Sequence, residues 1–306
     1  MNVTWQGVIP AMTTPFDTGE RVDERFLREH ARWLVEQGCT ALVPLGSLGE
    51  SATLSPAEKR RVIEVCVDAA GARVPVIPGI AALGTAEAVA LARDARAAGA
   101  SGLMVLPPYV YSADWREMKA HVRAVIAATD LPCMLYNNPV AYKTDFVPAQ
   151  IAELALELPN LQAVKESSMD VRRVTAIRAL IADRLHLLCG VDDAIVEAVG
   201  AGATGWIAGL VNAFPAESVA LFRYAAEGRR DEAFAFYRWF LPLLRMDTVP
   251  KFVQLIKLAQ ERVGMGTTRV RGPRLPLAGE ELREANAILD HALATRPALA
   301  REPVRA

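Results

Sequence analysis

Eight short runs rich in valine, isoleucine and leucine recur along this chain, and longer amphipathic stretches separate them. The runs are mostly apolar, which is typical of strands that are buried on both faces. Strands that alternate with helices form a mainly parallel sheet, and spacings of about 20 to 35 residues fit one strand and one helix per repeat. The sequence therefore predicts an α/β fold, a closed (β/α)8 TIM barrel, with strands within residues 7–11, 41–45, 75–79, 102–106, 132–136, 161–165, 186–190 and 205–209.

The stretches between these runs carry signals for helix starts and stops. Ser55, Pro56 and Glu58 form a capping box with proline at the first helical position, which predicts a helix over residues 56–70. An eighth helix is expected to begin near Pro215. The candidate N-caps of three further helices are Thr85, Ser112 and Asp170, and the candidate helix stops are Gly38, Gly71 and Gly99.

The alternation of strands and helices ends after Gly228. Residues 231–245, 250–263 and 280–293 have helical patterns, and no linker rich in proline, glycine or serine precedes them. We therefore expect a barrel over residues 1–228 and a helical extension over residues 229–306. The extension would pack on the barrel or on a neighbouring subunit, as part of one structural unit.

The charge balance argues against two classes of partner. The 34 Lys and Arg residues are matched by 35 Asp and Glu residues, so no basic field is available for nucleic acid or an anionic membrane. No apolar run reaches the roughly 18 residues of a membrane span, and the N-terminus lacks the features of a signal peptide. A cytoplasmic location is therefore expected.

The cysteines and histidines are few and scattered. Cys39, Cys66, Cys133 and Cys189 lie in apolar stretches without a CxxC motif, so we expect buried core positions instead of disulfides or structural zinc. The four histidines show no metal-ligand spacing, which disfavours a metal-dependent aldolase. We expect no metal and no cofactor.

Active sites of such barrels form at the carboxyl ends of the strands, and one lysine stands at such an end. The chain has six lysines against 28 arginines, and Lys165 alone ends a buried strand run. Burial disfavours a charged amine, and a neutral amine can attack a carbonyl to form a Schiff base. A rim lysine that pairs with Glu166 or another carboxylate is the alternative that position alone leaves open.

Two further candidates follow other strand runs. Tyr136 ends the run before that of Lys165, so its hydroxyl could pass protons in the same pocket, and an aromatic plug of the barrel is the alternative. Ser47 lies in a turn between Gly46 and Gly49, whose backbone donors could hold a carboxylate. Residues 200–205 match a dinucleotide fingerprint but precede a strand instead of opening a helix, so no nucleotide site is expected.

The order of these motifs resembles that of a known family. Residues 46–54, 136–139 and 164–167 are similar to the carboxylate-binding loop, the tyrosine motif and the Schiff-base lysine motif of the dihydrodipicolinate synthase and N-acetylneuraminate lyase family. These are class I lyases and aldolases. Residues 190–193 and 205–207 resemble the turns that complete the family's pocket, and the similarity extends from about Gly7 to Pro276.

The resemblance implies a reaction on a small 2-oxo acid or its cyclic imine. Lys165 would attack the carbon beside the substrate carboxylate, and Tyr136, assisted by Ser47, would move the protons. The residues that the resemblance assigns to substrate binding are Gly46, Ser47, Leu48, Gly190 and Ile207.

In the family, a tyrosine from a neighbouring subunit completes the proton relay, and Tyr109 matches its position. The resemblance therefore implies that Tyr109 is a catalytic residue. It also implies a homo-oligomer, a tetramer built as a dimer of dimers.

The sequence departs from the synthases of this family in three places. They carry an arginine for the carboxylate of a second substrate where this chain has Ala141, and a glycine where it has Lys143. They also carry two adjacent threonines where this chain has Ser47 and Leu48. Condensation of pyruvate with an aldehyde acid is therefore disfavoured.

Residues 46–50, 136–142, 209–215 and 274–277 resemble one subgroup, the 1-pyrroline-4-hydroxy-2-carboxylate deaminases of hydroxyproline degradation. Such an enzyme releases ammonia and 2-oxoglutarate semialdehyde and needs no arginine for a second substrate. We therefore predict this deaminase activity. The alternatives are a 4-hydroxy-tetrahydrodipicolinate synthase, an aldolase or dehydratase of 2-keto-3-deoxy sugar acids, and a barrel that binds a 2-oxo acid without turnover.

Overall fold

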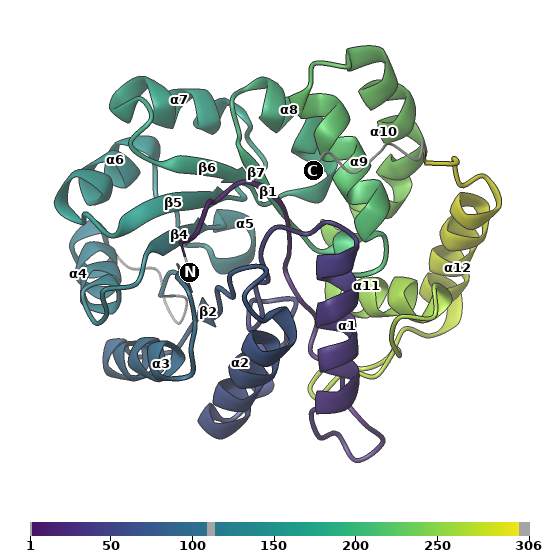
Figure 1. Cartoon of the computed structure of the whole chain (residues 1–306), viewed down its shortest axis with the longest axis horizontal. Coiled ribbons are helices and arrows are strands. Elements are labelled where there is room, and N and C mark those ends of the chain that lie inside the picture. The colour runs from purple at the N-terminus through teal and green to yellow at the C-terminus, as the bar shows by residue number, and fades with distance from the viewer. Residues whose placement is uncertain (1, 109–113, 300–306) are drawn as a thin grey trace.

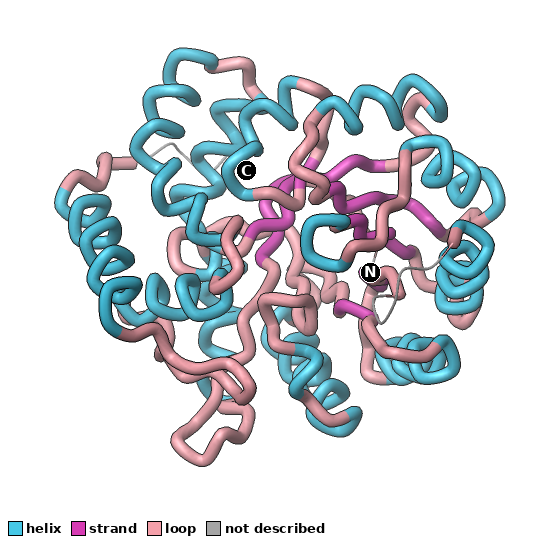
Figure 2. The backbone as a smooth tube through the Cα atoms, turned by 180° about the vertical axis from the view of Figure 1, so that it is seen from behind, coloured by secondary structure: helices cyan, strands magenta, loops and turns pink. Residues whose placement is uncertain are grey.

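The computed structural model describes residues 2–108 and 114–299, and within them a curled sheet of seven parallel strands forms the centre. Figure 1 shows the strands with helices around them, and Figure 2 shows the same arrangement from behind. The order in the sheet is β1-β7-β6-β5-β4-β3-β2. The strands are β1 (Gly7–Pro10), β2 (Gly79–Ile80), β3 (Leu103–Val105), β4 (Cys133–Asn137), β5 (Leu161–Glu166), β6 (His186–Cys189) and β7 (Gly205–Ala208).

The predicted strand run at residues 41–45 closes the ring between β1 and β2. Val43 forms a parallel bridge with Ala11, and Leu42 forms one with Val76. The amide of Val43 also donates to the carbonyl of Pro10 at 3.0 Å. Each β-unit is therefore paired with the next along the chain, and β1 pairs with β7.

Prolines explain why this part of the ring is irregular. Pro44, Pro75 and Pro78 have no backbone N–H and cannot donate to a ladder. Residues 41–45 consequently form bridges only, and the run at 75–79 is reduced to the bridge at Val76 and the short β2. The other six runs form strands whose ends lie within one residue of the predicted ends. The predicted barrel fold is confirmed.

Helices cover the outside of the ring (Figure 2). The capping box predicted at the start of α2 is present, because the Ser55 hydroxyl accepts from the Glu58 amide at 3.3 Å and the Glu58 carboxylate accepts from the Ser55 amide at 2.9 Å. The helices that follow the strands are α1 (Glu24–Glu36), α2 (Pro56–Ala70), α3 (Thr85–Ala97), α4 (Trp115–Ile126), α5 (Pro139–Tyr142), α6 (Pro148–Glu157), α7 (Arg172–Ile181), α8 (Ile195–Gly200) and α9 (Pro215–Ala226).

Two predicted N-caps are wrong in detail. Thr85 is the first residue of α3, after an extended Gly84, and its hydroxyl bonds His121 Nδ1 instead of capping the helix. Asp170 lies one residue before the cap of α7 and accepts from the amide of Arg172 at 3.1 Å. The third candidate, Ser112, lies outside the described residues. The predicted stops have positive φ where α1, α2 and α3 end, at Gly38, Gly71 and Gly99.

The three helices predicted after Gly228 are present as α10 (Arg230–Leu244), α11 (Phe252–Arg262) and α12 (Gly279–Ala294). The ring of Phe240 in α10 packs edge-on against Phe214, with centroids 6.0 Å apart. Beyond α12, Arg296 forms an ion pair with the buried Glu217 of α9 at 2.5 Å. Both contacts join this segment to the helix that follows β7.

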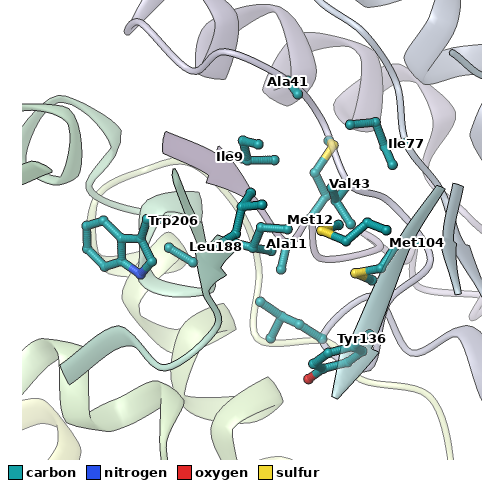
Figure 3. Close-up of a cluster of buried hydrophobic side chains, with 14 of the residues drawn as sticks. Ile9, Ala11, Met12, Ala41, Val43, Ile77, Met104, Tyr136, Leu188 and Trp206 are labelled. Atoms are coloured by element: carbon teal, nitrogen blue, oxygen red, sulfur yellow. The ribbon is translucent and has the colours of Figure 1, made fainter. Parts of the chain in front are cut away.

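Apolar side chains from strands that are distant in sequence meet inside the ring. Figure 3 shows Ile9, Val43, Met104 and Leu188 in one cluster, with Tyr136 at its edge. The four cysteines are buried as predicted, and burial raises the pKa of each thiol to about 12. Among the described residues, no helix has both the length and the apolar composition needed to cross a membrane.

Candidate functional site

A cavity of about 410 Å³ opens where the carboxyl ends of the strands meet the segment that precedes α11. It brings together six residues that the sequence singles out, from four separate segments of the chain. These wall residues are Gly46, Ser47, Leu48, Tyr136, Lys165 and Gly190.

Lys165 is placed in this wall by the pairing of β4 with β5. It lies beside Tyr136 in the register of the two strands, and its Nζ is 4.2 Å from the centroid of the Tyr136 ring. Both residues are buried, with exposed fractions of 6% for Lys165 and 5% for Tyr136. Within the described residues, the Lys165 amine has no ion pair and no hydrogen-bond acceptor.

The ion pair between Lys165 and Glu166 does not form. Successive residues of a strand point to opposite faces, so these two side chains diverge. The Glu166 carboxylate accepts from Asn137 Nδ2 at 3.0 Å and from the Ser168 amide at 2.7 Å. Burial raises the pKa of Glu166. Glu166 therefore does not neutralise the Lys165 amine, which lines the cavity.

Gly190 makes room for the lysine side chain. A Cβ at this position would overlap the Ser167 hydroxyl and would lie 2.6 Å from Cε of Lys165. The Ser167 hydroxyl donates instead to the Gly190 carbonyl at 3.0 Å. A residue with a Cβ does not fit directly after β6, because the side chains of Ser167 and Lys165 occupy that space.

The turn that contains Ser47 has an unusual backbone. Leu45 and Glu50, on either side of it, have left-handed φ values of 64° and 54°, which residues other than glycine rarely adopt. The amides of Ser47 and Leu48 donate no hydrogen bond within the described part of the chain. Two free backbone donors in a cavity wall provide an anion-binding arrangement.

A buried ion pair fixes this turn to the C-terminal helices. Glu50 accepts from Lys257 of α11 at 2.5 Å, and both side chains are almost fully buried. The second carboxylate oxygen of Glu50 accepts from the amide of Arg271 at 3.0 Å. The carbonyl of Gly49 also accepts from Thr14 at 2.6 Å. The turn is therefore held from two sides.

The hydroxyl groups of Ser47 and Tyr136 have different partners. Ser47 bonds the hydroxyl of Tyr142, and Tyr136 accepts from Asn138 Nδ2 at 2.9 Å. The rings of Tyr136 and Tyr142 meet edge-on with centroids 5.9 Å apart. Lys143 has a φ of 58°, so it adopts the left-handed conformation that a glycine would take at the end of α5.

Two buried carboxyl groups, Asp192 and Asp247, meet at Gly209. Asp192 lies in the turn at residues 190–193 that resembles the family's pocket, whereas Asp247 was not singled out from the sequence. Asp192 accepts from the Trp206 indole at 3.2 Å, from the Leu210 amide at 2.9 Å and from the Gly209 amide at 3.2 Å. Asp247 lines the cavity, and its Oδ1 is buried without a hydrogen-bond partner in the described residues. Burial raises the pKa of Asp192 to about 7, and burial together with the nearby Asp192 raises the pKa of Asp247 well above its usual range.

The remaining two predicted site residues are not part of the described wall. Ile207 is buried in β7 and does not line the cavity among the described residues. Tyr109 lies outside the described residues.

Comparisons with known proteins agree on one family. The chain matches the model of the dihydrodipicolinate synthetase family over residues 4–292. It is 33% identical over 285 residues to a 4-hydroxy-tetrahydrodipicolinate synthase from Citrifermentans bemidjiense, which covers 93% of this chain and 98% of that protein. It is 35% identical over 292 residues to the protein of the same name from Hyphomonas neptunium, which covers 95% and 98%.

Solved structures support the same relationship. The 4-hydroxy-tetrahydrodipicolinate synthase from Methylacidiphilum fumariolicum superposes with a TM-score of 0.91 at 27% identity, over 94% of this chain and 96% of that chain. The dihydrodipicolinate synthase from Acinetobacter baumannii, solved in complex with pyruvate, superposes with a TM-score of 0.90 at 28% identity, over 94% and 99%. Because the family match spans nearly the whole chain, this protein belongs to the dihydrodipicolinate synthetase family of lyases.

Proposed function

We propose that Lys165 forms a Schiff base with a small 2-oxo acid or its cyclic imine. The observation that carries this proposal is the position of the Lys165 amine in the cavity wall, buried and without an ion pair in the described residues. Among the described residues, Asp192 and Asp247 act on the amine only through their charges and form no ion pair with it, so the amine is available to attack a carbonyl or imine carbon. The free amides of Ser47 and Leu48 would hold the substrate carboxylate next to that carbon.

We further propose that the substrate is 1-pyrroline-4-hydroxy-2-carboxylate. The described cavity wall contains one cationic side chain, Lys165, and one carboxyl side chain, Asp247. Ala141 lines the wall where the family's synthases would carry an arginine. A substrate with a single carboxylate fits this wall, whereas a second carboxylate would find no cation to offset its desolvation.

The reaction then follows from one lysine and one proton relay. Attack of Lys165 on C2 displaces the ring nitrogen, which stays on C5 as an amino group. Transfer of a C3 proton to the relay of Tyr136 and departure of the C4 hydroxyl give a conjugated imine. After the double bond moves to C5, hydrolysis there releases ammonia, and hydrolysis at C2 releases 2-oxoglutarate semialdehyde and restores Lys165.

A second candidate is 4-hydroxy-tetrahydrodipicolinate synthesis. This activity is the one named for relatives that are 33% and 35% identical to the chain. It would use the same Schiff base, formed with pyruvate, which then attacks the aldehyde of aspartate semialdehyde. The absence of an arginine from the described cavity wall favours the deaminase over this reaction.

Chemical trapping tests the Schiff base. Borohydride reduction in the presence of pyruvate, followed by peptide mass analysis, is expected to label Lys165. Lys143→Ala should be labelled as well as the wild type, and Lys165→Ala should not be labelled. An unlabelled wild-type protein, under conditions that label another enzyme of the family, would refute the proposal.

A substrate panel tests the choice of reaction. We expect ammonia release from 1-pyrroline-4-hydroxy-2-carboxylate and no condensation of pyruvate with aspartate semialdehyde. Rapid condensation without ammonia release would establish the second candidate instead. Turnover of 2-keto-3-deoxy sugar acids alone would assign the protein to the aldolases or dehydratases.

We also propose a homo-oligomer, a tetramer by family resemblance, in which Tyr109 of a neighbouring subunit completes the proton relay. Its test is the mass in solution, measured by sedimentation, together with mixed oligomers of two variants. If the subunits share sites, Lys165→Ala and Tyr109→Phe subunits should regain activity when they are mixed. Mixtures that stay inactive would contradict shared sites.

A further inference from the structure

Asp247 lies in the same cavity wall as Lys165, yet the reaction outlined above leaves it without a role. Its Oδ1 is buried and has no hydrogen-bond partner in the described part of the chain. A buried carboxyl oxygen without a partner is costly, and use by a ligand or a reaction is one reason for a fold to keep such a group. We therefore expect Asp247 to interact with the molecule that occupies the cavity.

Gly209 shows that the fold keeps a space for this carboxyl group. A Cβ at position 209 would overlap Oδ1 of Asp247 and would lie 2.7 Å from its Oδ2. The φ of Gly209 is −86°, an ordinary value that any residue adopts. Glycine is therefore needed here for space and not for its backbone freedom. Gly209 is a positioning residue for Asp247.

The neighbouring Asp192 decides which of the two acids is charged. Two carboxyl groups that meet in a buried place cannot both ionise without a large cost. Asp192 accepts hydrogen bonds from Trp206, Leu210 and Gly209, all of which stabilise a negative charge. Asp247 has no such donor for its Oδ1, and burial beside Asp192 outweighs the opposing effects of Lys165 and the Gly209 amide on its pKa, so we assign the pair's proton to Asp247. The cavity is thus lined by a neutral carboxylic acid, which can donate a proton.

We propose that Asp247 is the acid that protonates the C4 hydroxyl of the substrate as it leaves, a role that rests on the proposed deaminase function. The proton of the Asp247 carboxyl group passes to the hydroxyl oxygen while the C4–O bond breaks, and the bonding pair departs with the oxygen as water. The electron pair of the broken C3–H bond, held in the enamine on Lys165, forms the new double bond to C4. Asp247 remains as a carboxylate and regains a proton from water, so no oxidant or reductant is needed.

The proposal also defines a substrate class. A neutral acid in the same cavity wall as the lysine selects 2-oxo acids or cyclic imines that carry a hydroxyl group on C4, because this hydroxyl both binds the acid and accepts its proton. Substrates without this hydroxyl, such as pyruvate, can form the Schiff base but gain nothing from Asp247. Schiff-base formation and elimination should therefore be separable by changes at Asp247.

The test compares Asp247→Asn with Asp183→Asn, a matched change in an acid whose side chain is 89% exposed and does not line the described cavity wall. Asp247→Asn keeps the size and neutrality of the side chain but cannot supply an acidic proton. We expect kcat for ammonia release from 1-pyrroline-4-hydroxy-2-carboxylate to fall by about 10²- to 10⁴-fold. Asp183→Asn should stay near the wild-type rate, and borohydride with pyruvate should still label Lys165 in both variants.

A leaving group that needs no proton provides the decisive readout. With the 4-chloro analogue of the substrate, which expels chloride, Asp247→Asn should release ammonia at nearly the wild-type rate. Asp247→Ala should behave in the same way, so the test can still be made if Asp247→Asn folds poorly.

A raised KM with unchanged kcat on the hydroxyl substrate would overturn the acid role. A wild-type enzyme that releases no ammonia would overturn the proposed function and this proposal together, whereas an active wild type with an equally active Asp247→Asn would overturn this proposal alone.

Discussion

At the scale of single residues, two glycines shape the candidate site by what they leave out. Gly190 leaves space for the side chain of Lys165, and Gly209 leaves space for the carboxyl group of Asp247. Neither glycine has a left-handed backbone, so a larger residue could adopt either conformation but would displace its neighbour. The positions of the reactive groups therefore depend on residues that carry no chemistry of their own.

Gly190→Ala should inactivate the enzyme without unfolding it. The added methyl group would lie 2.6 Å from Cε of Lys165, so the lysine side chain must move. Because a misplacement of about 1 Å can cost 10²-fold, we expect kcat to fall at least about 10²-fold. The matched control is Gly200→Ala, where a Cβ meets nothing within 4 Å. Equal borohydride labelling of Lys165 in the two variants would contradict this prediction.

His30 should make the stability of the protein depend on pH. Its ring is fully buried and bonds the carbonyl of Asn212 at 2.9 Å, and burial lowers its pKa to about 4. Between about pH 6.5 and pH 4 the unfolded state therefore binds one proton more than the folded state. The free energy of unfolding should fall as the pH falls through this window, by up to about 1.4 kcal/mol per pH unit from this residue.

Urea unfolding of the wild type and of His30→Gln at several pH values checks this prediction. Other groups titrate in the same range, but they do so in both proteins and cancel in the difference. The two stability curves should converge as the pH falls from 6.5 to 4. Parallel curves would show that His30 does not carry the effect.

Some residues of the site could be predicted from the sequence, and others could not, for a physical reason. Lys165 and Tyr136 end strand runs, and the ends of parallel strands meet at one face of a barrel. Asp247 precedes α11, in a segment that no strand leads into. Only the packing of the C-terminal helices on the barrel brings it to the cavity. The periodicity of a sequence predicts helices and strands but not how they pack together.

Between elements, the Glu50–Lys257 pair joins the turn that contains Ser47 to α11. Lys257→Met would leave the buried Glu50 carboxylate with only the more distant Arg274, at 3.7 Å, as its cation. Breaking a buried ion pair typically destabilises a protein by about 3–5 kcal/mol. Lys251→Met is the matched control, because Lys251 pairs with Glu281 on the surface and such pairs contribute about 0–1 kcal/mol. Urea unfolding measures both changes. A loss of less than about 1 kcal/mol in Lys257→Met would show that Glu50 finds another partner or a proton.

The elements themselves followed the sequence closely, apart from one part of the barrel. Six strand runs and the helix with the capping box lie where predicted because apolar runs and caps act locally. The run at residues 41–45 pairs only through bridges, since a proline in a ladder removes a donor whatever the apolar pattern favours. The pairing of this run depends on hydrogen bonds with the segments beside it in the barrel, and these segments are distant in sequence.

For the whole molecule, the barrel and the C-terminal helices share the walls of one cavity. Lys165 comes from β5, and Asp247 comes from the segment between α10 and α11. Figure 1 shows α10 and α11 lying against the barrel helices at one side of the molecule. A site assembled in this way exists only while both parts are folded, which argues for one cooperative unit over two independent domains.

Hydrogen exchange should reveal this cooperativity. Because α11 holds the Glu50 turn and α10 packs on the helix after β7, amides in β5 and in α11 should open with the same free energy and the same dependence on urea. Mass spectrometry of peptides from both elements at increasing urea concentrations measures this. In Lys257→Met, the control that weakens the connection, α11 should open at lower urea than β5. If α11 already opened at lower urea than β5 in the wild type, the C-terminal helices would be a separate folding unit. The part of the cavity wall that contains Asp247 would then unfold independently of the barrel strand that carries Lys165.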